Sequence, residues 1–196
     1  ALMQAGRYSE AVSTLGRVAE LEPNSPQAHE SLAVALMQTG RVKDATASFQ
    51  RAVALQPGDS DIQDHLGQGL MQAGRSSEGL AAFQRAMELA PSSAGAHDDF
   101  GVALMQTGKF PEAVASLRRA SELQPDSTEI LNNYGVALMR AARVADAIAP
   151  LQRAVDLGPD SPEARENLAQ ALMQSGRFQE AVATFERIVE LRPNKP

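Results

Sequence analysis

The 196-residue sequence contains no cysteine and no tryptophan, and aromatic residues make up only 4% of it. Without cysteine, the chain can form neither a disulfide nor a metal site with thiolate ligands. It has no run of about 18 apolar residues, so no segment is predicted to span a membrane. The formal net charge of −6 argues against nucleic acid as a partner, because phosphates are bound by basic surfaces.

The beginning of the chain lacks the features of a signal peptide. Residues 1–4 read ALMQ, with no basic segment before an apolar core, which favours a cytoplasmic location. There is no initiator methionine at position 1, and the sequence opens inside a repeated segment. We therefore expect a fragment, a processed chain, or part of a longer protein.

A seven-residue segment that occurs six times organises the rest of the sequence. The copies occupy residues 1–7, 35–41, 69–75, 103–109, 137–143 and 171–177. Each copy begins 34 residues after the previous one, without insertion or deletion. A fixed period of this length indicates one supersecondary unit, stacked many times.

One repeat, residues 26–59, has the pattern of a helical hairpin. Ser25–Pro26 is a helix start, because serine caps free N–H groups and proline is tolerated in the first turn. Apolar residues at helical spacing then predict a helix to about Thr39, which Gly40 ends. A second helix is predicted from near Lys43 to Pro57–Gly58.

The helix-breaking proline after each second helix recurs in register. It stands at Pro23, Pro57, Pro91, Pro125, Pro159 and Pro193. Small residues that allow close packing recur in the second helices at Ala11, Ala45, Gly79, Ala113, Ala147 and Ala181. Larger residues recur four positions later at Leu15, Phe49, Phe83, Leu117, Leu151 and Phe185.

This 34-residue pattern resembles the tetratricopeptide repeat (TPR) over the whole chain. Residues 1–196 then form a single array, with a partial repeat at 1–25 and full repeats at 26–59, 60–93, 94–127, 128–161 and 162–195. The large aromatic residue that the family places early in the first helix is absent, since those positions hold His29, Gln63, His97, Leu131 and Arg165. The resemblance implies an all-α, right-handed superhelical solenoid of antiparallel helix hairpins. It also implies a concave groove, lined by the first helices, for a peptide or protein, and it implies no catalysis and no cofactor.

Two rows of the first helices are expected to face that groove. The rows are Gln27, Asp61, Gly95, Glu129 and Glu163, and Glu30, Asp64, Asp98, Asn132 and Glu166. Seven of the ten residues are acidic and none is basic, so we expect a partner with a lysine- or arginine-bearing segment. A neighbouring row, Ser31, His65, Asp99, Asn133 and Asn167, only weakly resembles the asparagine ladder of glycosyltransferase TPR arrays.

A methionine occupies the same position in every repeat, at Met3, Met37, Met71, Met105, Met139 and Met173. Methionine is flexible and polarizable, which suits a partner of variable shape. The same row also fits a second interpretation, in which methionines fill the gaps between hairpins. The sequence leaves both open, and we include Met37, Met71, Met105 and Met139 among the candidate groove residues.

Residue types that could support catalysis or bind a metal are present without a useful arrangement. His29 and His97 are two repeats apart, which places them beyond a shared coordination sphere. The adjacent pair Asp98–Asp99 points in two directions on a helix. The sequence therefore predicts a protein that is not an enzyme.

Both ends of the array carry apolar residues, and this raises a structural alternative to ligand binding. The last helix has the pattern of an internal one, with Phe178, Val182, Phe185, Ile188 and Val189 available to another hairpin. At the other end, Leu2 and Tyr8 are expected to be partly uncovered. Two different apolar ends form a heterologous contact, which builds an open filament. The competing explanation is that further repeats follow in a longer protein.

Overall fold

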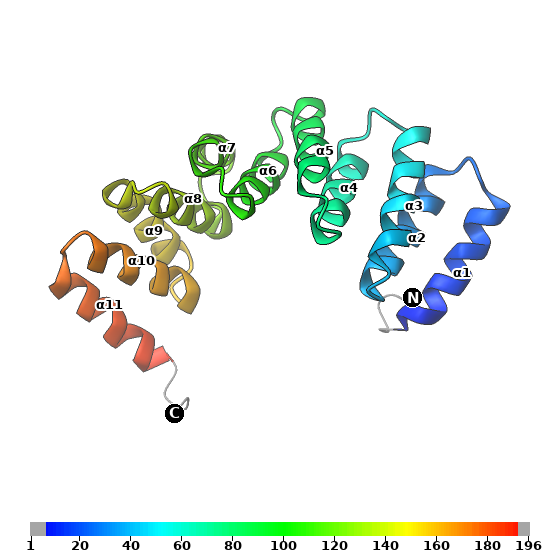
Figure 1. Cartoon of the computed structure of the whole chain (residues 1–196). Helices are drawn as coiled ribbons and strands as arrows, with labels where there is room; N and C mark the ends of the chain where they lie inside the picture. Colours follow the sequence, from blue (N-terminus) through cyan, green and yellow to red (C-terminus); the bar gives the residue numbers. More distant parts are fainter. Residues whose placement is uncertain (1–6, 192–196) are drawn as a thin grey trace. The chain divides into compact units, whose positions relative to one another are not determined.

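The computed structural model describes residues 7–191, and within this range the chain is all-α (Figure 1). Its helices are α1 (Tyr8–Leu21), α2 (Pro26–Gln38), α3 (Val42–Leu55), α4 (Ser60–Gln72), α5 (Ser76–Leu89), α6 (Ala94–Gln106), α7 (Phe110–Leu123), α8 (Thr128–Arg140), α9 (Val144–Leu157), α10 (Pro162–Gln174) and α11 (Phe178–Leu191). None of these helices is long and apolar enough to cross a membrane.

The helices form hairpins whose first members begin at the predicted repeat boundaries. The pairs are α2–α3, α4–α5, α6–α7, α8–α9 and α10–α11, and α1 is the second helix of the partial repeat. The predicted fold class, antiparallel helix hairpins of the TPR solenoid type, is confirmed. The second helix of the repeat analysed above begins at Val42, one residue before the predicted start.

Every first helix begins with a side-chain cap. The capping residues are Ser25, Asp59, Ser93, Ser127 and Ser161. In each case the side-chain oxygen accepts a hydrogen bond from the backbone N–H three residues later, for example Ala28 N to Ser25 Oγ at 3.2 Å. The cap satisfies a backbone donor that has no partner inside the helix.

The turn inside each hairpin requires a left-handed residue. Gly40, Gly74, Gly108 and Gly176 have φ between 73° and 79°, and Ala142 takes the same place with φ 60°. Backbone hydrogen bonds such as Arg41 N to Leu36 O (2.9 Å) close the turn, in the pattern that usually carries glycine. The fourth full repeat therefore keeps the turn but holds an alanine in a conformation that disfavours a Cβ atom.

In the α4–α5 and α6–α7 hairpins a large residue of the second helix packs on a glycine of the first. An added Cβ atom at Gly101 would lie 2.5 Å from Leu117 Cγ, and at Gly67 it would lie 2.9 Å from Phe83 Cδ2. Glycine thus lets the two helices approach each other. Leu117 and Phe83 are almost completely buried, at 0% and 4% exposure.

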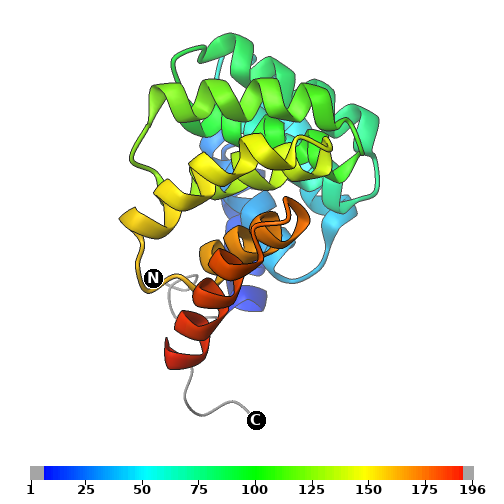
Figure 2. The same cartoon turned by 90° about the vertical axis from the view of Figure 1, so that its left-hand side faces the viewer.

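The chain divides into two compact units at Pro91. Unit 1 holds α1–α5, with α1 packed on α2 and α3 on α4; unit 2 holds α6–α11, with α7 packed on α8 and α9 on α10. In unit 2 the first helices also meet directly, α6 with α8 and α8 with α10, and α10 lies beside α11 (Figure 2). This stacking brings residues that are about one repeat apart in sequence together on one face.

Candidate functional site

The first of the two acidic rows lies at the solvent surface. Asp61, Glu129 and Glu163 are exposed, and each is in the first turn of its helix. The helix macrodipole favours a negative charge there, so these acids also stabilise their own helices. Their side chains are accessible to a ligand.

Most residues of the second row are more buried than those of the first row. Glu30, Asp64 and Asp98 are half-buried, Asn132 is only 7% exposed, and Glu166 alone is exposed. Four of its five members are therefore less accessible to solvent than the exposed acids of the first row. Its half-buried carboxylates are poorly hydrated and need partners.

In unit 1, Glu30 has such a partner on the next hairpin. His65 Nδ1 lies 2.9 Å from Glu30 Oε1 in a hydrogen bond between α4 and α2. The His65 ring also stacks on Phe49 of α3, with centroids 6.0 Å apart. Glu30 is thus engaged in holding two hairpins together.

Unit 2 repeats this connection with asparagines. Asn133 Nδ2 donates to both carboxylate oxygens of Asp98 at 3.2 Å, and Asn167 Nδ2 donates to Asn132 Oδ1 at 2.8 Å. Each bond joins residues 35 apart in adjacent hairpins, the same offset as in the His65–Glu30 pair. His65, Asn133 and Asn167 belong to the row that weakly resembles the asparagine ladder of glycosyltransferase TPR arrays. Here they connect hairpins.

A pocket of about 340 Å³ opens between the N-terminal ends of α8 and α10 in unit 2. It is lined by Thr128, Glu129, Asn132, Asn133, Ser161, Glu163 and Ala164. Asn132 Nδ2 donates to Glu163 Oε1 at 3.3 Å, which orients this carboxylate at the pocket. Three residues of the predicted rows, Glu129, Asn132 and Glu163, thus converge on one concave site.

Burial and neighbouring carboxylates alter the acidity of two members of the second row. Burial raises the pKa of Asp98 to about 6; the hydrogen bond from Asn133 acts against this rise, and Asp99 and Glu129 add to it. Burial also raises the pKa of Asp64, while His65 and the hydrogen bond from Gln68 oppose the rise. A cation near either carboxylate would stabilise its ionised form.

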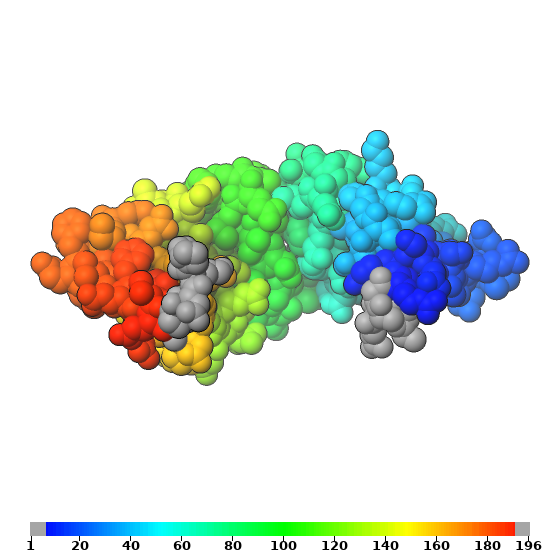
Figure 3. All heavy atoms as spheres, turned by 90° about the horizontal axis from the view of Figure 1, so that it is seen from below, coloured from blue at the N-terminus to red at the C-terminus, as the bar shows by residue number. Residues whose placement is uncertain are grey.

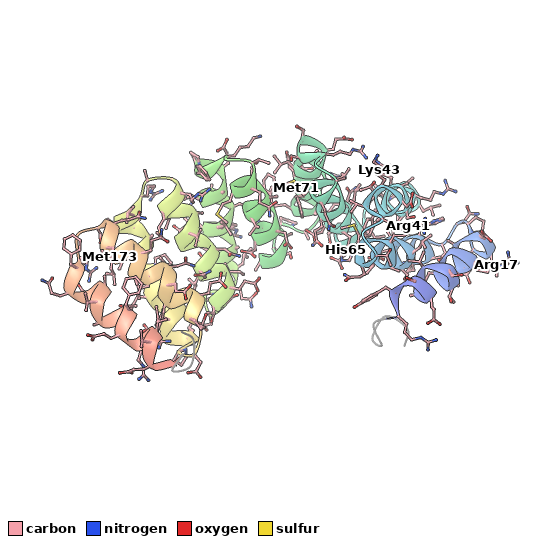
Figure 4. All side chains as sticks on the ribbon, turned by 60° about the horizontal axis from the view of Figure 1, so that its bottom comes forward. Arg17, Arg41, Lys43, His65, Met71 and Met173 are labelled. Atoms are coloured by element: carbon pink, nitrogen blue, oxygen red, sulfur yellow. The ribbon has the colours of Figure 1, made fainter. Side chains whose placement is uncertain are left out.

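Two members of the methionine row pack against residues of neighbouring helices, Met37 across two hairpins and Met71 within its own hairpin. Met37 packs against the buried cluster that includes Phe49 and Leu66, and Met71 lies over Gly79. Met105 and Met139 are half-buried, whereas Met173, labelled in Figure 4, is 44% exposed. These contacts favour the interpretation of Met37 and Met71 as gap-filling residues.

The outer face of α11 is apolar and exposed. Phe178, Val182, Phe185 and Val189 are 54%, 53%, 43% and 69% exposed, and α11, red in Figure 3, lies at the surface of unit 2. Ile188 is only 9% exposed, so assigning it to this open face was wrong: it packs on the inner side of its helix. At the other end Tyr8 is half-buried, and Leu2 lies outside the described residues.

Among residues 7–191, no group of three histidine, aspartate or glutamate side chains is placed to hold a metal ion. The acidic rows and the pocket carry hydrogen-bond acceptors and negative charge. This chemistry suits the recognition of cationic groups.

Comparison with known proteins decides the family. A tetratricopeptide repeat model matches residues 1–60 and 99–162, and a second one matches residues 138–196. The chain belongs to the tetratricopeptide repeat family. No curated protein gives a significant match to the sequence of this TPR chain.

Several solved structures share the fold. The crystal structure of YrrB, a TPR protein with an unusual peptide-binding site, is 16% identical and matches with a TM-score of 0.74 over 94% of this chain and 95% of that one. The MamA 41-end structure from Desulfovibrio magneticus RS-1 is 17% identical, with a TM-score of 0.79 over 87% of this chain and 96% of that one. The C-terminal part of a TPR protein from Cytophaga hutchinsonii is 17% identical, with a TM-score of 0.80 over 97% and 76% of the two chains.

Proposed function

We propose that this TPR protein is a non-catalytic binding scaffold, whose acidic first-helix surface takes a protein or peptide segment that carries lysine or arginine. The observation that carries the proposal is the pocket between α8 and α10, where Glu129 and Glu163 meet. YrrB is a TPR protein with a peptide-binding site, which supports a peptide as the class of ligand.

The pocket offers a cation both charge and fixed acceptors. Glu163 accepts a hydrogen bond from Asn132, and Asn132 is itself held by Asn167. An acceptor that is already oriented loses little entropy when a ligand binds. Hydrogen bonds between a carboxylate and a lysine or arginine head group are charge-assisted and about twice as strong as neutral ones. A cationic side chain in this pocket would therefore anchor the segment.

The neighbouring hairpin adds a second attraction. The Asp98 carboxylate is half-buried, and both of its oxygens accept hydrogen bonds from the neutral amide of Asn133. A lysine or arginine nearby would favour its ionised form, and the partly buried pair would be screened less by salt than a surface pair. Binding should weaken as the salt concentration rises, because the exposed acids of the first row are screened.

The test compares two pairs of substitutions that remove the same charge. The probe is a short fluorescein-labelled peptide of alternating lysine and serine, and its affinity is measured by fluorescence anisotropy. Glu129→Gln with Glu163→Gln should weaken binding at least about tenfold, which corresponds to about 1.4 kcal/mol. The matched control is Glu112→Gln with Glu186→Gln on the second helices α7 and α11. Equal losses of peptide affinity in the two double variants would show that only net charge matters and would refute the proposed site.

A second candidate function, end-to-end assembly, is favoured by the exposed face of α11. At the junction of α3 and α4, Gly69 lies against Phe49 and Thr46. The positions of α11 that correspond to these two contacts are Phe185 and Val182, which are exposed. We infer that this face takes the N-terminal end of another copy of the chain, so that the copies assemble head to tail.

Light scattering across a concentration series tests the assembly. The mass should rise with concentration for the parent chain, and Phe185→Glu should suppress the rise. Ala183→Glu adds the same charge on the other side of α11 and should leave the rise unchanged, because residues two apart on a helix point in nearly opposite directions. A monomeric mass at every concentration would refute this function and would leave the peptide-binding proposal intact.

A further inference from the structure

A second pocket, of about 610 Å³, lies in unit 1 on the side of α2 away from the acidic row. Leu32 and Leu36 of α2 form part of its wall. Leu32 lies two residues after Glu30, and Leu36 lies two residues after Val34. Because residues two apart on a helix point in nearly opposite directions, the pocket is on the other side of α2 from Glu30 and Val34. Helix α1 contributes Gly16, and residues at the start of α3 complete the lining. The volume falls within the range of about 300–1,000 Å³ that small-molecule sites occupy.

Gly16 opens this pocket, and no packing requirement explains it. An added Cβ atom at Gly16 would meet nothing within 4 Å, whereas the same atom at Gly101 would clash with a leucine. The corresponding positions of the other repeats hold long polar side chains, Gln50, Gln84, Arg118, Gln152 and Glu186. Glycine inside a helix is destabilising relative to alanine, so here the chain gives up helix stability and leaves a cavity.

The pocket combines an apolar wall with guanidinium groups. Leu36 is 3% exposed and Leu32 and Val12 are half-buried. Arg17 on α1 and Arg41 just before α3 stand at the rim, and both are labelled in Figure 4. Lys43 follows Arg41 and lines the adjoining pocket.

Both arginines are already paired, but weakly. Arg17 Nη1 lies 3.1 Å from Glu20 Oε2, and Arg41 Nη2 lies 2.7 Å from Asp44 Oδ2. The side chains are 55–74% exposed, and such exposed pairs between neighbouring helix residues contribute little to stability. A guanidinium has five N–H donors, so each arginine keeps donors for a further carboxylate. Glu20 and Asp44 line the pocket as well, so a bound carboxylate would share the two guanidinium groups with these acids.

We propose that this pocket binds a small organic acid, with its apolar body against Leu32 and Leu36 and its carboxylate at Arg17 and Arg41. The volume, the apolar wall and the remaining N–H donors of the two arginines together point to an anionic amphiphile. The site lies away from the acidic first-helix surface, so its test is independent of the peptide-binding proposal.

The experiment uses three probes that share one apolar body and differ in charge. They are 1-naphthaleneacetate, its neutral amide, and the cationic 1-naphthylmethylamine, titrated into the full chain by isothermal calorimetry. Shifts of the Ser13, Gly16 and Ser48 amide signals locate the site by NMR. The acid should bind about five- to tenfold more tightly than the amide, because only the acid makes charge-assisted hydrogen bonds. The amine should bind least.

Substitutions separate the wall from the rim. Gly16→Gln places the side chain of the other repeats in the cavity and should weaken the acid and the amide alike, by about tenfold or more. Gly16→Ala is the matched control, since its methyl group occupies little of the space and should leave binding within about twofold. Arg17→Gln with Arg41→Gln should reduce the acid-to-amide ratio to about one, and the affinity for the amide should remain.

Three results would overturn the proposal. The first is that the amine or the amide binds as tightly as the acid. The second is that Gly16→Gln, folded by circular dichroism, binds the acid as well as the parent does. The third is that the peptide acetyl-Leu-Phe, as its free acid, binds more tightly than 1-naphthaleneacetate, which would assign the pocket to a peptide terminus and not to a small acid.

Discussion

Replacing Asp98 by asparagine should stabilise unit 2 at neutral pH and not at acidic pH. The pKa of Asp98 is raised from 3.8 to about 6, mainly by burial. Between these two values the folded chain holds a proton that the unfolded chain has released. Stability therefore falls as the pH rises from about 4 to about 6, and the loss is complete above that range. This is the opposite of the usual behaviour of an ion-paired aspartate.

The size of the effect follows from the shift. Each pKa unit corresponds to 1.36 kcal/mol, so a shift of about two units sets an upper limit of about 3 kcal/mol at neutral pH. Asp98 is only half-buried, and solvent screening reduces this to about 1–2 kcal/mol. Asparagine is neutral throughout and keeps a carbonyl oxygen that can accept the hydrogen bond of Asn133. We expect a gain of about 1–2 kcal/mol above about pH 7 and almost none below about pH 4.

Urea unfolding followed by circular dichroism at several pH values measures the gain. Because a repeat array can unfold in stages, the comparison uses the transition that Asp98→Asn shifts. Asp160→Asn, at an exposed position of the same unit, is the control and should change stability little at any pH. A gain that does not depend on pH, or a loss at neutral pH, would refute the reasoning. Under the proposed function, the same variant should also bind the lysine peptide less tightly, because a carboxylate is removed.

Four further substitutions test the packing by thermal unfolding. Gly16→Ala should stabilise the chain by about 0.5–1 kcal/mol, whereas Gly101→Ala should destabilise it by about 1–3 kcal/mol, because only the second methyl group meets a side chain. Ala142→Gly should stabilise by about 0.5–1 kcal/mol, since φ is 60° there. Asn167→Ala should cost about 1–3 kcal/mol by leaving the buried Asn132 without its donor; a cost near zero would show that the bond between hairpins is dispensable.

The fold of this chain was predictable from the sequence because its determinants are local. Ser25 and Pro26 start a helix and Gly40 ends it through backbone effects that act within a few residues. The 34-residue period then repeats these signals without a change of register. The face of each first helix on which Asp61 or Glu129 lies also follows from helical periodicity alone.

How deeply the residues on those faces are buried was decided by the tertiary structure. Periodicity placed Glu30, Asp98 and Asn132 in one row, but the structure buries them to different degrees and bonds each to a residue 35 positions later. Such contacts depend on the rotation and translation between hairpins, which all the packed side chains set together and no local signal encodes. The same holds for Gly16, which is one weak helix residue in the sequence and becomes the opening of a pocket only where α1, α2 and the start of α3 meet around it.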